Sequence, residues 1–538
     1  MKKLFALIMT LCLVLSLAAC GGGEAASGGD GVVDVCFASE PATIDPALSS
    51  AVDSAVMLQH SFEGLVKWVD DGEGNAILVP GMAESWDVSE DELTWTFHIR
   101  EGATWTDGEP VKSTDFEYAW KRLISPETAA DYAYMVDMVA GYEEGNLQIS
   151  CPDEKTFVVV LGAACPYFEE ICAFPATFPV RQDIIEEYGD QWTFDPATYV
   201  SNGPFKMTAW EHNSYIMYEK NENYYGAADV TATKIKFHLM EDANAMYAAY
   251  KSGELDYIQD FPQDEIQALI ESGEMTIDDY VGTYYVVFQT QKAPFNDPRV
   301  REAFNLVIDR NFVTEQITGR GEVAASGFVP AGVYDFAGAG SDDFRTVGGD
   351  YYSVAAEDYE ANCEKARELL ADAGFPGGEG FPVVEYLYNT SDNHKAIGEA
   401  LQNMWQTELG VSVNLQNQEW NVFLKERKNG NFDIARGGWI ADYNDPMTFI
   451  DMFMTGGGNN DPQYACAEFD AVVKQAKATS DLEKRMQLLH DAEDLVLGRD
   501  WAVAPIYFYT QPYMLNDSIE GMYYTPLGYF FFGYTSGM

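Results

Sequence analysis

Alternating and periodic apolar positions predict a chain in which strands and helices follow one another. Thr94–Ile99 alternates strictly, with aromatic and branched side chains on one face, and Val32–Phe37 and Tyr284–Phe288 are further runs of strand-forming residues. After Asp297 and Pro298 the apolar residues return with the period of a helix, and 363–373 is a second helical segment. Helices between strands predict α/β lobes.

The first twenty residues carry the pattern of a secretory signal. Two lysines precede an apolar run from Leu4 to Leu17, which is shorter than the roughly twenty residues that cross a bilayer. The letters LAAC at 17–20 resemble a bacterial lipobox, which implies a signal peptide at 1–19 and a lipid anchor on Cys20. Residues 20–31 are mostly small and predict a flexible tether. A plain secreted protein with a chance cysteine is the alternative.

Composition limits the number of domains and the partners. The chain has 538 residues, more than one hydrophobic core holds, so two or three domains are expected. A hydrophobic fraction of 47% excludes wholesale disorder. With 86 Asp and Glu against 32 Lys and Arg, the net charge of -54 argues against nucleic acid and anionic lipid surfaces as partners.

Cysteines and histidines form no catalytic or metal-binding motif. Six cysteines follow Cys20 without a C-x-x-C pair, which favours buried free thiols and leaves a bridge between Cys165 and Cys172 open. The six histidines are scattered, and H-E-x-x-H, G-x-S-x-G and a Gly-rich phosphate loop are absent from the sequence. We therefore expect no cofactor and no catalytic residues. A secreted peptidase that grips peptide ends is the enzyme alternative.

The stretch from 419 to 446 gathers candidate binding residues. It sets Arg427 and Arg436 near two glycines, at 437 and 438, and Asp442. Glycines after a short buried strand let another chain approach the backbone, as in strand-addition recognition. Asp442 suits an ammonium, and either guanidinium suits a carboxylate. Ordinary ion pairs around a glycine turn are the alternative reading of these residues.

A second candidate position lies at the start of a predicted helix. Ser391 and Asp392 are typical of an N-cap, and Gly410 ends the apolar pattern after Leu409. His394 then lies in the first turn, where backbone amides and the helix dipole favour a carboxylate. An exposed histidine with no role is the alternative.

Six sequence blocks carry a resemblance to a known family. They are PGMAESWDV, VSNGPFK, QKAPFNDPRVREAF, YNTSDNHK, NLQNQEWNVFLKER and FDIARGGWIADYNDP. Together they resemble the oligopeptide-binding proteins of bacterial ABC importers, the extracellular solute-binding proteins of family 5. The likeness runs from about Val32 to the region near Tyr509, in the family's order.

The resemblance implies an α/β, two-lobed clamshell fold of the periplasmic-binding-protein kind, with an additional β-rich domain. Lobe I would comprise 32–66, 192–281 and 510–538, the additional domain 67–191, and lobe III 282–509.

The resemblance also implies roles for individual residues. Asp442 would take the peptide α-ammonium, and Arg427, Arg436 and His394 would take carboxylates of peptides of different lengths. The other expected contacts are side-chain pockets or main-chain partners: Gly438, Trp439, Trp420, Tyr132, Tyr280, Tyr285 and Val52. Thr318 departs from the family, since it stands where members have a lysine used for longer ligands. Gly282 and Ile440 stand where enteric relatives have a small disulfide.

The expected function is that of a lipid-anchored receptor on the extracytoplasmic side of the cell membrane. It would act as a monomer, close two lobes over a short peptide, and deliver the peptide to an ABC transporter permease. A binding protein of the same fold for nickel, haem or a sugar is the alternative within this class.

Overall fold

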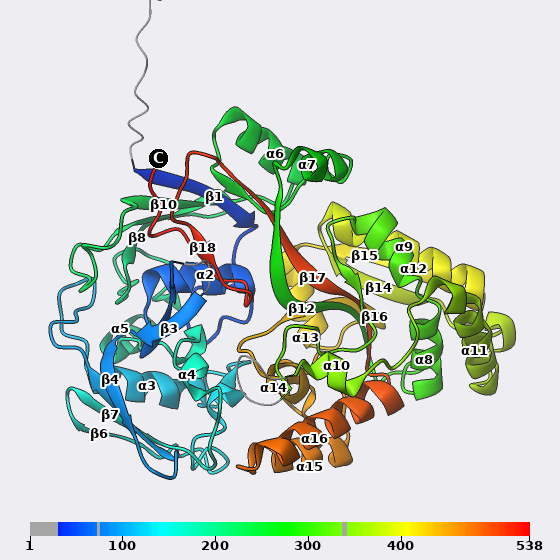
Figure 1. Cartoon of the computed structure of the whole chain (residues 1–538), viewed down its shortest axis with the longest axis horizontal. Coiled ribbons are helices and arrows are strands. Elements are labelled where there is room, and N and C mark those ends of the chain that lie inside the picture. Colours follow the sequence, from blue (N-terminus) through cyan, green and yellow to red (C-terminus); the bar gives the residue numbers. More distant parts are fainter. Residues whose placement is uncertain (1–30, 73–75, 336–341, 538) are drawn as a thin grey trace, which may run out of the picture.

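One mixed sheet of eleven strands runs through both lobes of the molecule (Figure 1). The structure is a computed structural model that describes residues 31–72, 76–335 and 342–537. The strand order is β15-β14-β16-β12-β17-β11-β1-β10-β9-β8, with β13 beside β17. The strands are β15 (Val413–Gln418), β14 (Val384–Asn389), β16 (Ile434–Ile440), β12 (Thr276–Phe288), β17 (Val503–Leu515), β11 (Tyr257–Ile258), β1 (Val32–Ala38), β10 (Lys234–Leu239), β9 (Tyr215–Lys220), β8 (Phe205–Glu211) and β13 (Val323–Ala324). Parallel pairs, β1 with β10 and β14 with β15, stand among antiparallel ones, so the α/β class is confirmed.

Two long strands join the lobes. β12 and β17 have 13 residues each and pair antiparallel along most of their length. Their register shifts between Asp279 and Thr283, and such irregularities bend a ladder. The predicted lobe boundaries at 281/282 and 509/510 fall inside these strands, so the lobes share a continuous sheet. The second half of β12 is buried throughout, which explains why its sequence is apolar without alternation.

Helices cover the sheet in the lobe beyond Gly282. α12 (Asp392–Leu409) packs on β14 and β15, and α8 (Pro298–Leu306) packs on α11 (Tyr359–Asp372). Ser391 caps α12 through its side chain, and Gly410 ends it with φ at +70°, as predicted. The predicted helix at 363–373 begins earlier, at Tyr359, because a 3₁₀ turn leads into it.

The other helices of this lobe are shorter than α12. They are α9 (Arg310–Phe312), α10 (Phe344–Gly348), α13 (Trp420–Lys428), α14 (Met447–Ile450), α15 (Ala467–Lys477) and α16 (Leu482–Glu493). In the first lobe, α2 (Val52–Ser61), α6 (Ala243–Ser252) and α7 (Ile266–Ser272) accompany the strands, and β18 (Tyr523–Tyr524) pairs with β19 (Phe530–Phe531).

A four-stranded antiparallel sheet lies within 67–191. Its order is β4 (Ala83–Val88), β5 (Thr94–Ile99), β7 (Thr156–Val160) and β6 (Ile149–Asp153), and β2 (Val66–Asp70) with β3 (Ala76–Pro80) forms a hairpin beside it. α3 (Ser113–Leu123), α4 (Phe168–Ile171) and α5 (Gln182–Tyr188) belong to the same region. The alternation predicted for β5 is confirmed, since every second side chain is buried. Lys112 is the N-cap of α3, and Asp115 lies in its first turn.

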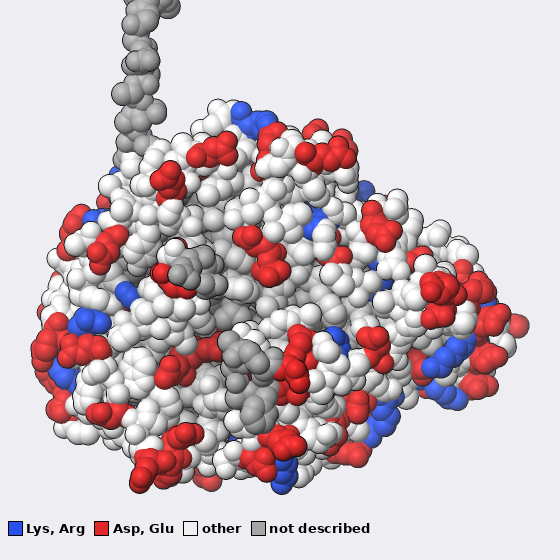
Figure 2. Space-filling view, viewed as in Figure 1, with Lys and Arg blue, Asp and Glu red and all other residues white. Residues whose placement is uncertain are grey.

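The predictions about the signal peptide, the cysteines, membrane spans and surface charge can be compared with the structure only for the described residues. Cys20 and the predicted signal peptide at 1–19 lie outside the described residues. Six cysteines, including Cys165 and Cys172, are free thiols. None of the described helices is long and apolar enough to cross a membrane. Figure 2 shows acidic residues spread over the visible face, with basic residues only in small groups among them.

Candidate ligand-binding cleft

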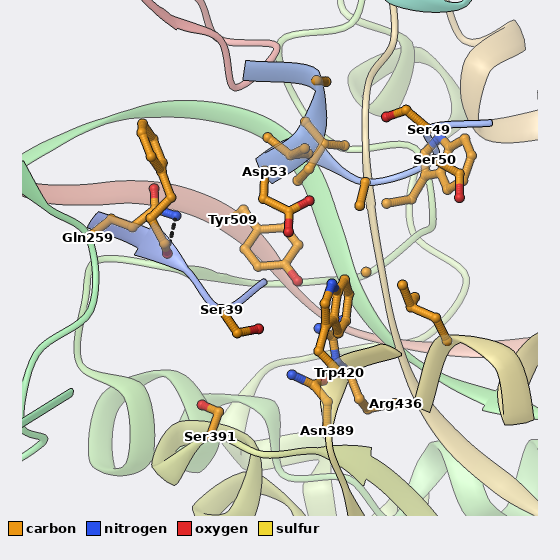
Figure 3. Close-up of a pocket in the computed structure, with 18 of the residues that line it drawn as sticks. Ser39, Ser49, Ser50, Asp53, Gln259, Asn389, Ser391, Trp420, Arg436 and Tyr509 are labelled. Atoms are coloured by element: carbon orange, nitrogen blue, oxygen red, sulfur yellow. Dashed lines mark hydrogen bonds between the residues drawn. The ribbon is translucent and has the colours of Figure 1, made fainter. Parts of the chain in front are cut away.

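A cavity of about 410 Å³ lies between the lobes, and a second cavity of about 280 Å³ adjoins it. Segments far apart in sequence line the larger one, among them 49–53 at the start of α2, Tyr132 of the β-rich region, α13 and β16. Figure 3 shows Asn389, Trp420 and Arg436 grouped on one side and Ser49, Ser50 and Asp53 on the opposite side. Both lobes therefore contribute walls to the cavity.

The edge of β16 has an unpaired stretch at this cavity. β16 pairs with β12 along its whole length, but with β14 only at Ile434 and Ala435. No other described strand pairs with the stretch from Arg436 to Ile440 on that side. Gly438 lines the cavity, and a Cβ there would come within 2.5 Å of the Tyr509 hydroxyl. Glycine thus keeps this backbone edge open.

Asp442 lies two residues beyond the end of β16 and is buried, with 8% of its surface exposed. Tyr132 donates its hydroxyl to Oδ1 at 2.8 Å, and Thr448 donates to Oδ2 at 3.0 Å. Burial raises the pKa of this carboxyl to about 8, while these two hydrogen bonds act in the opposite direction. In the cleft as it stands, the carboxyl favours its neutral form at pH 7. A cation beside it would reverse that preference.

Arg436 is the cation that the cleft leaves without an acidic partner. Its Nε donates to Asn389 Oδ1 at 2.8 Å, and its guanidinium lies over the Trp420 ring at 5.6 Å. The described residues form no ion pair with it, although every other cation that lines the two cavities has one. A half-buried guanidinium held by an amide and aromatic faces is suited to a carboxylate that comes with a ligand.

Two neighbouring cations are already paired. Arg427 Nε lies 2.8 Å from Asp461 Oδ2, and both side chains are largely buried. Lys428 pairs with Asp131. The alternative reading from sequence, ordinary ion pairs, therefore describes Arg427 but not Arg436. Arg427 lines the cavity all the same, so its prediction as a contact stays open.

His394 lines both cavities from the first turn of α12. Its Nδ1 lies 3.3 Å from the Tyr284 hydroxyl. Burial, and then the charges of Arg436 and Arg320, lower the pKa of His394 well below its usual value. The ring is neutral at pH 7, so it offers a ligand a hydrogen bond and no charge.

The remaining predicted residues divide into two groups. Those that line the larger cavity are Val52, Tyr132, Tyr280, Trp420, Gly438 and Trp439. Tyr285 lines neither cavity, and its prediction as a contact is corrected. Successive residues of β12 point to opposite faces, so Tyr284 meets His394 while Tyr285 packs on Phe328, with ring centroids 5.0 Å apart.

The two departures from the family also have a place in the structure. Thr318 is fully buried, donates to Glu322 at 2.9 Å, and does not line either cavity. Arg320, two residues further on, lines the second cavity, and sequence reasoning missed it. Gly282 and Ile440 lie opposite each other in the β12–β16 ladder.

Direct contacts cross from the β-rich region to the lobe beyond Gly282. Besides Tyr132 with Asp442, Lys428 pairs with Asp131 and Lys477 pairs with Asp137. The rings of Tyr167 and Tyr443 stack with centroids 4.2 Å apart and planes at 2°. The lobes thus meet around the cavity, and the sequence offered no signal for these pairs because their members lie about 280 to 340 residues apart.

Comparisons with known proteins identify a family and individual proteins that are similar to this chain. Residues 78–461 match the family described as bacterial extracellular solute-binding proteins, family 5 Middle. The chain is 33% identical to the dipeptide-binding protein DppE of Bacillus subtilis over 98% of both chains. It matches a crystal structure of Haemophilus influenzae OppA in complex with RPPGFSPFR, with a TM-score of 0.86, 29% identity, and coverage of 93% of this chain and 98% of that one.

Two structures of a third relative, MppA, match the present structure to different extents. The Escherichia coli murein tripeptide-binding protein MppA matches with a TM-score of 0.84, at 31% identity and over 93% of this chain and 96% of that chain. The unliganded open form of MppA matches with only 0.60, at 31% identity and over 92% and 94% of the two chains. The lobes of the present structure therefore differ in arrangement from that open form.

Proposed function

The chain belongs to family 5 of the bacterial extracellular solute-binding proteins, and on that basis we propose that it captures short peptides outside the cytoplasm for import by an ABC transporter. The observation that carries this proposal is the open edge of β16 between Asp442 and Arg436. A backbone edge accepts any peptide main chain, and the two charges suit the two peptide ends.

The spacing of these groups suggests an orientation and a length. Asp442 follows β16 and would hold the ammonium, while Arg436 lies near its start and would hold the carboxylate, so the peptide would run antiparallel to β16. The four residues from 437 to 440 span about 13 Å at about 3.3 Å per residue. That distance matches about four extended peptide residues, and shorter or longer peptides would use other carboxylate partners such as His394 or Arg427.

Closure of the lobes would complete the site. The cross-lobe contacts Tyr132–Asp442 and Lys428–Asp131 form only when the β-rich region meets the far lobe. A peptide that touches both walls favours the closed arrangement by its differential affinity for it. β12 and β17 are the strands that would bend, at the register shift near Gly282.

Delivery and anchoring complete the proposal. A lipid on Cys20 would keep the monomeric receptor at the extracytoplasmic face of the membrane, where it meets the permease. Nucleic acid and anionic lipid are unsuitable partners, because the acidic residues on the surface would repel them (Figure 2).

Mass spectrometry of the purified protein after unfolding tests the proposal. Short, heterogeneous peptides should be released. Release of a metal chelate, haem or a sugar, with no peptide, would instead support the alternative solutes, and cleaved peptide products would support a peptidase. Calorimetry of refolded, ligand-free protein with peptides of two to six residues then measures the length preference.

A further inference from the structure

The charges that line the two cavities do not balance. Six acids line them, namely Asp53, Glu241, Asp260, Glu322, Asp442 and Asp461, against the cations Arg320, Arg427, Lys428 and Arg436. Three of the cations are paired with Asp260, Asp461 and Asp131. A zwitterionic peptide would meet Asp442 and Arg436 with its two ends. That leaves Asp53, Glu241 and Glu322 without a cation.

Two of these three acids have a simple local explanation. Glu241 is an exposed residue at the rim, so water solvates it. Glu322 accepts hydrogen bonds at Oε2 from the Thr318 hydroxyl at 2.9 Å and from the Arg320 amide at 2.8 Å. Neither needs a ligand.

Asp53 differs from both. It lies in the first turn of α2 and lines both cavities, and its carboxylate points into the cavity in Figure 3. Oδ1 accepts the Ser54 amide at 2.7 Å, but Oδ2 is shielded from solvent and has no hydrogen-bond partner among the described residues. Burial raises the pKa of this carboxyl to about 6.

A helix dipole alone does not account for this placement. An acid in the first turn stabilises a helix equally well from the solvent side, where water satisfies both oxygens. A shielded carboxylate oxygen without a donor is destabilising, and such groups mark a site that a missing partner completes. Asp53 lines both cavities, so a ligand that occupies them would supply the partner.

We propose that Asp53 holds the ammonium or guanidinium of a lysine or arginine side chain of the bound peptide, so that the cleft prefers peptides with a cationic side chain at one position. This inference rests on the proposed peptide-binding function and adds a side-chain preference to it. Val52, the neighbouring residue, lies where main-chain pairing with the peptide is expected. A side chain from the paired peptide residue or its neighbour would reach Asp53 and the second cavity.

Calorimetry with matched tetrapeptides, the length that the spacing of Asp442 and Arg436 favours, tests this preference. Lysine is placed in turn at each position of an alanine tetrapeptide, and each peptide is compared with its norleucine counterpart, which keeps the aliphatic chain and lacks the charge. Wild-type protein should bind the lysine peptide at least tenfold more tightly at one position. Asp53→Asn should reduce that ratio to less than threefold and leave the norleucine affinities within threefold of wild type.

The controls separate the possible outcomes. Glu241→Gln changes a rim acid of the same cavity and should retain the lysine preference. Equal binding of lysine and norleucine peptides by wild type at every position overturns the inference and leaves the proposed function standing. A lysine preference that survives in Asp53→Asn also overturns it. If neither series binds at all, the proposed function fails and the inference with it. The wild-type comparison needs no variant, so equal binding of the two peptide series overturns the inference even if Asp53→Asn does not fold.

Discussion

Asp442→Asn, combined with acetylation of the peptide N-terminus, tests the proposed ion pair between the Asp442 carboxylate and the peptide ammonium. In the closed cleft the carboxyl is 8% exposed, and its pKa is raised to about 8 by burial. In an open cleft water would solvate it, and the pKa would return toward the ordinary value of about 3.9. A free peptide brings an ammonium, so the carboxylate stays ionised on closure. An acetylated peptide brings none.

The magnitude follows from these pKa values. At pH 7, an acetylated peptide can close the cleft only if Asp442 takes up a proton, which costs about 1.36 kcal/mol for each of roughly three pH units between 3.9 and 7. The penalty of about 4 kcal/mol agrees with the about 3 to 5 kcal/mol typical of a broken buried pair. It is about half of a micromolar binding free energy of about 8 kcal/mol, so acetylation should weaken binding roughly 1,000-fold.

The assay is a calorimetric cycle of two proteins and two peptides. Asp442→Asn should lose most of its affinity for the free peptide, because the ammonium is then buried without its counter-charge. The variant should nevertheless bind the acetylated peptide better than wild type does, because asparagine has no charge to neutralise. The two losses would therefore be far from additive. Additive losses, or equal affinity of wild type for both peptides, would refute the reasoning that Asp442 contacts the peptide N-terminus.

Four further predictions follow from the same geometry. Acetylated peptides should bind wild type about tenfold more tightly for each unit that pH falls between about 8 and 4, and Asp442→Asn should abolish this dependence in calorimetry. Arg436→Ala should lose affinity with little change in melting temperature, whereas Arg427→Ala should lower the melting temperature because it leaves Asp461 buried and unpaired. If both arginines lose affinity equally at every peptide length, their distinct roles are wrong. Cys20→Ser should move the protein from the membrane fraction to the soluble fraction, because the lipid attachment site is lost. An unchanged fractionation argues against lipidation. Ligand-free protein should be more compact by small-angle X-ray scattering at pH 5 than at pH 8, because protonation of Asp442 favours closure. Asp442→Asn should already be compact at pH 8. Equal compactness of the wild type at the two pH values argues against coupling of closure to this carboxyl.

Local sequence patterns predicted the elements that local physics determines. The cap of α12 needs only Ser391 and Gly410 in place, and the alternation of β5 needs only its own six residues. Six of the eleven candidate residues lie in the single stretch from Trp420 to Asp442, and all six line the larger cavity. The signal in that stretch is a pair of arginines close to two glycines in a chain that is otherwise strongly acidic.

Pairings between distant segments had no such signal. Whether Arg427 or Arg436 was free depended on Asp461, which lies 34 residues from one and 25 from the other. Tyr285 was misplaced because a shift of one residue moves a strand side chain to the opposite face. Asp53 has an ordinary first-turn pattern, and only the fold shows that its carboxylate faces the cavity.

In the proposed mechanism, Asp442 would also link ligand recognition to closure. Tyr132 donates to it from the β-rich region, so opening of the lobes would remove that bond and expose the carboxylate to water. An empty cleft that closes at pH 7 must then protonate Asp442, at a cost of about 4 kcal/mol, whereas a cleft with a peptide ammonium closes with the charge neutralised. A bias of that size keeps the empty receptor open in about 999 of 1,000 molecules if the two arrangements are otherwise equal in free energy. If Asp442 binds the peptide N-terminus as proposed, the same carboxyl would also keep a receptor without cargo from adopting the closed shape.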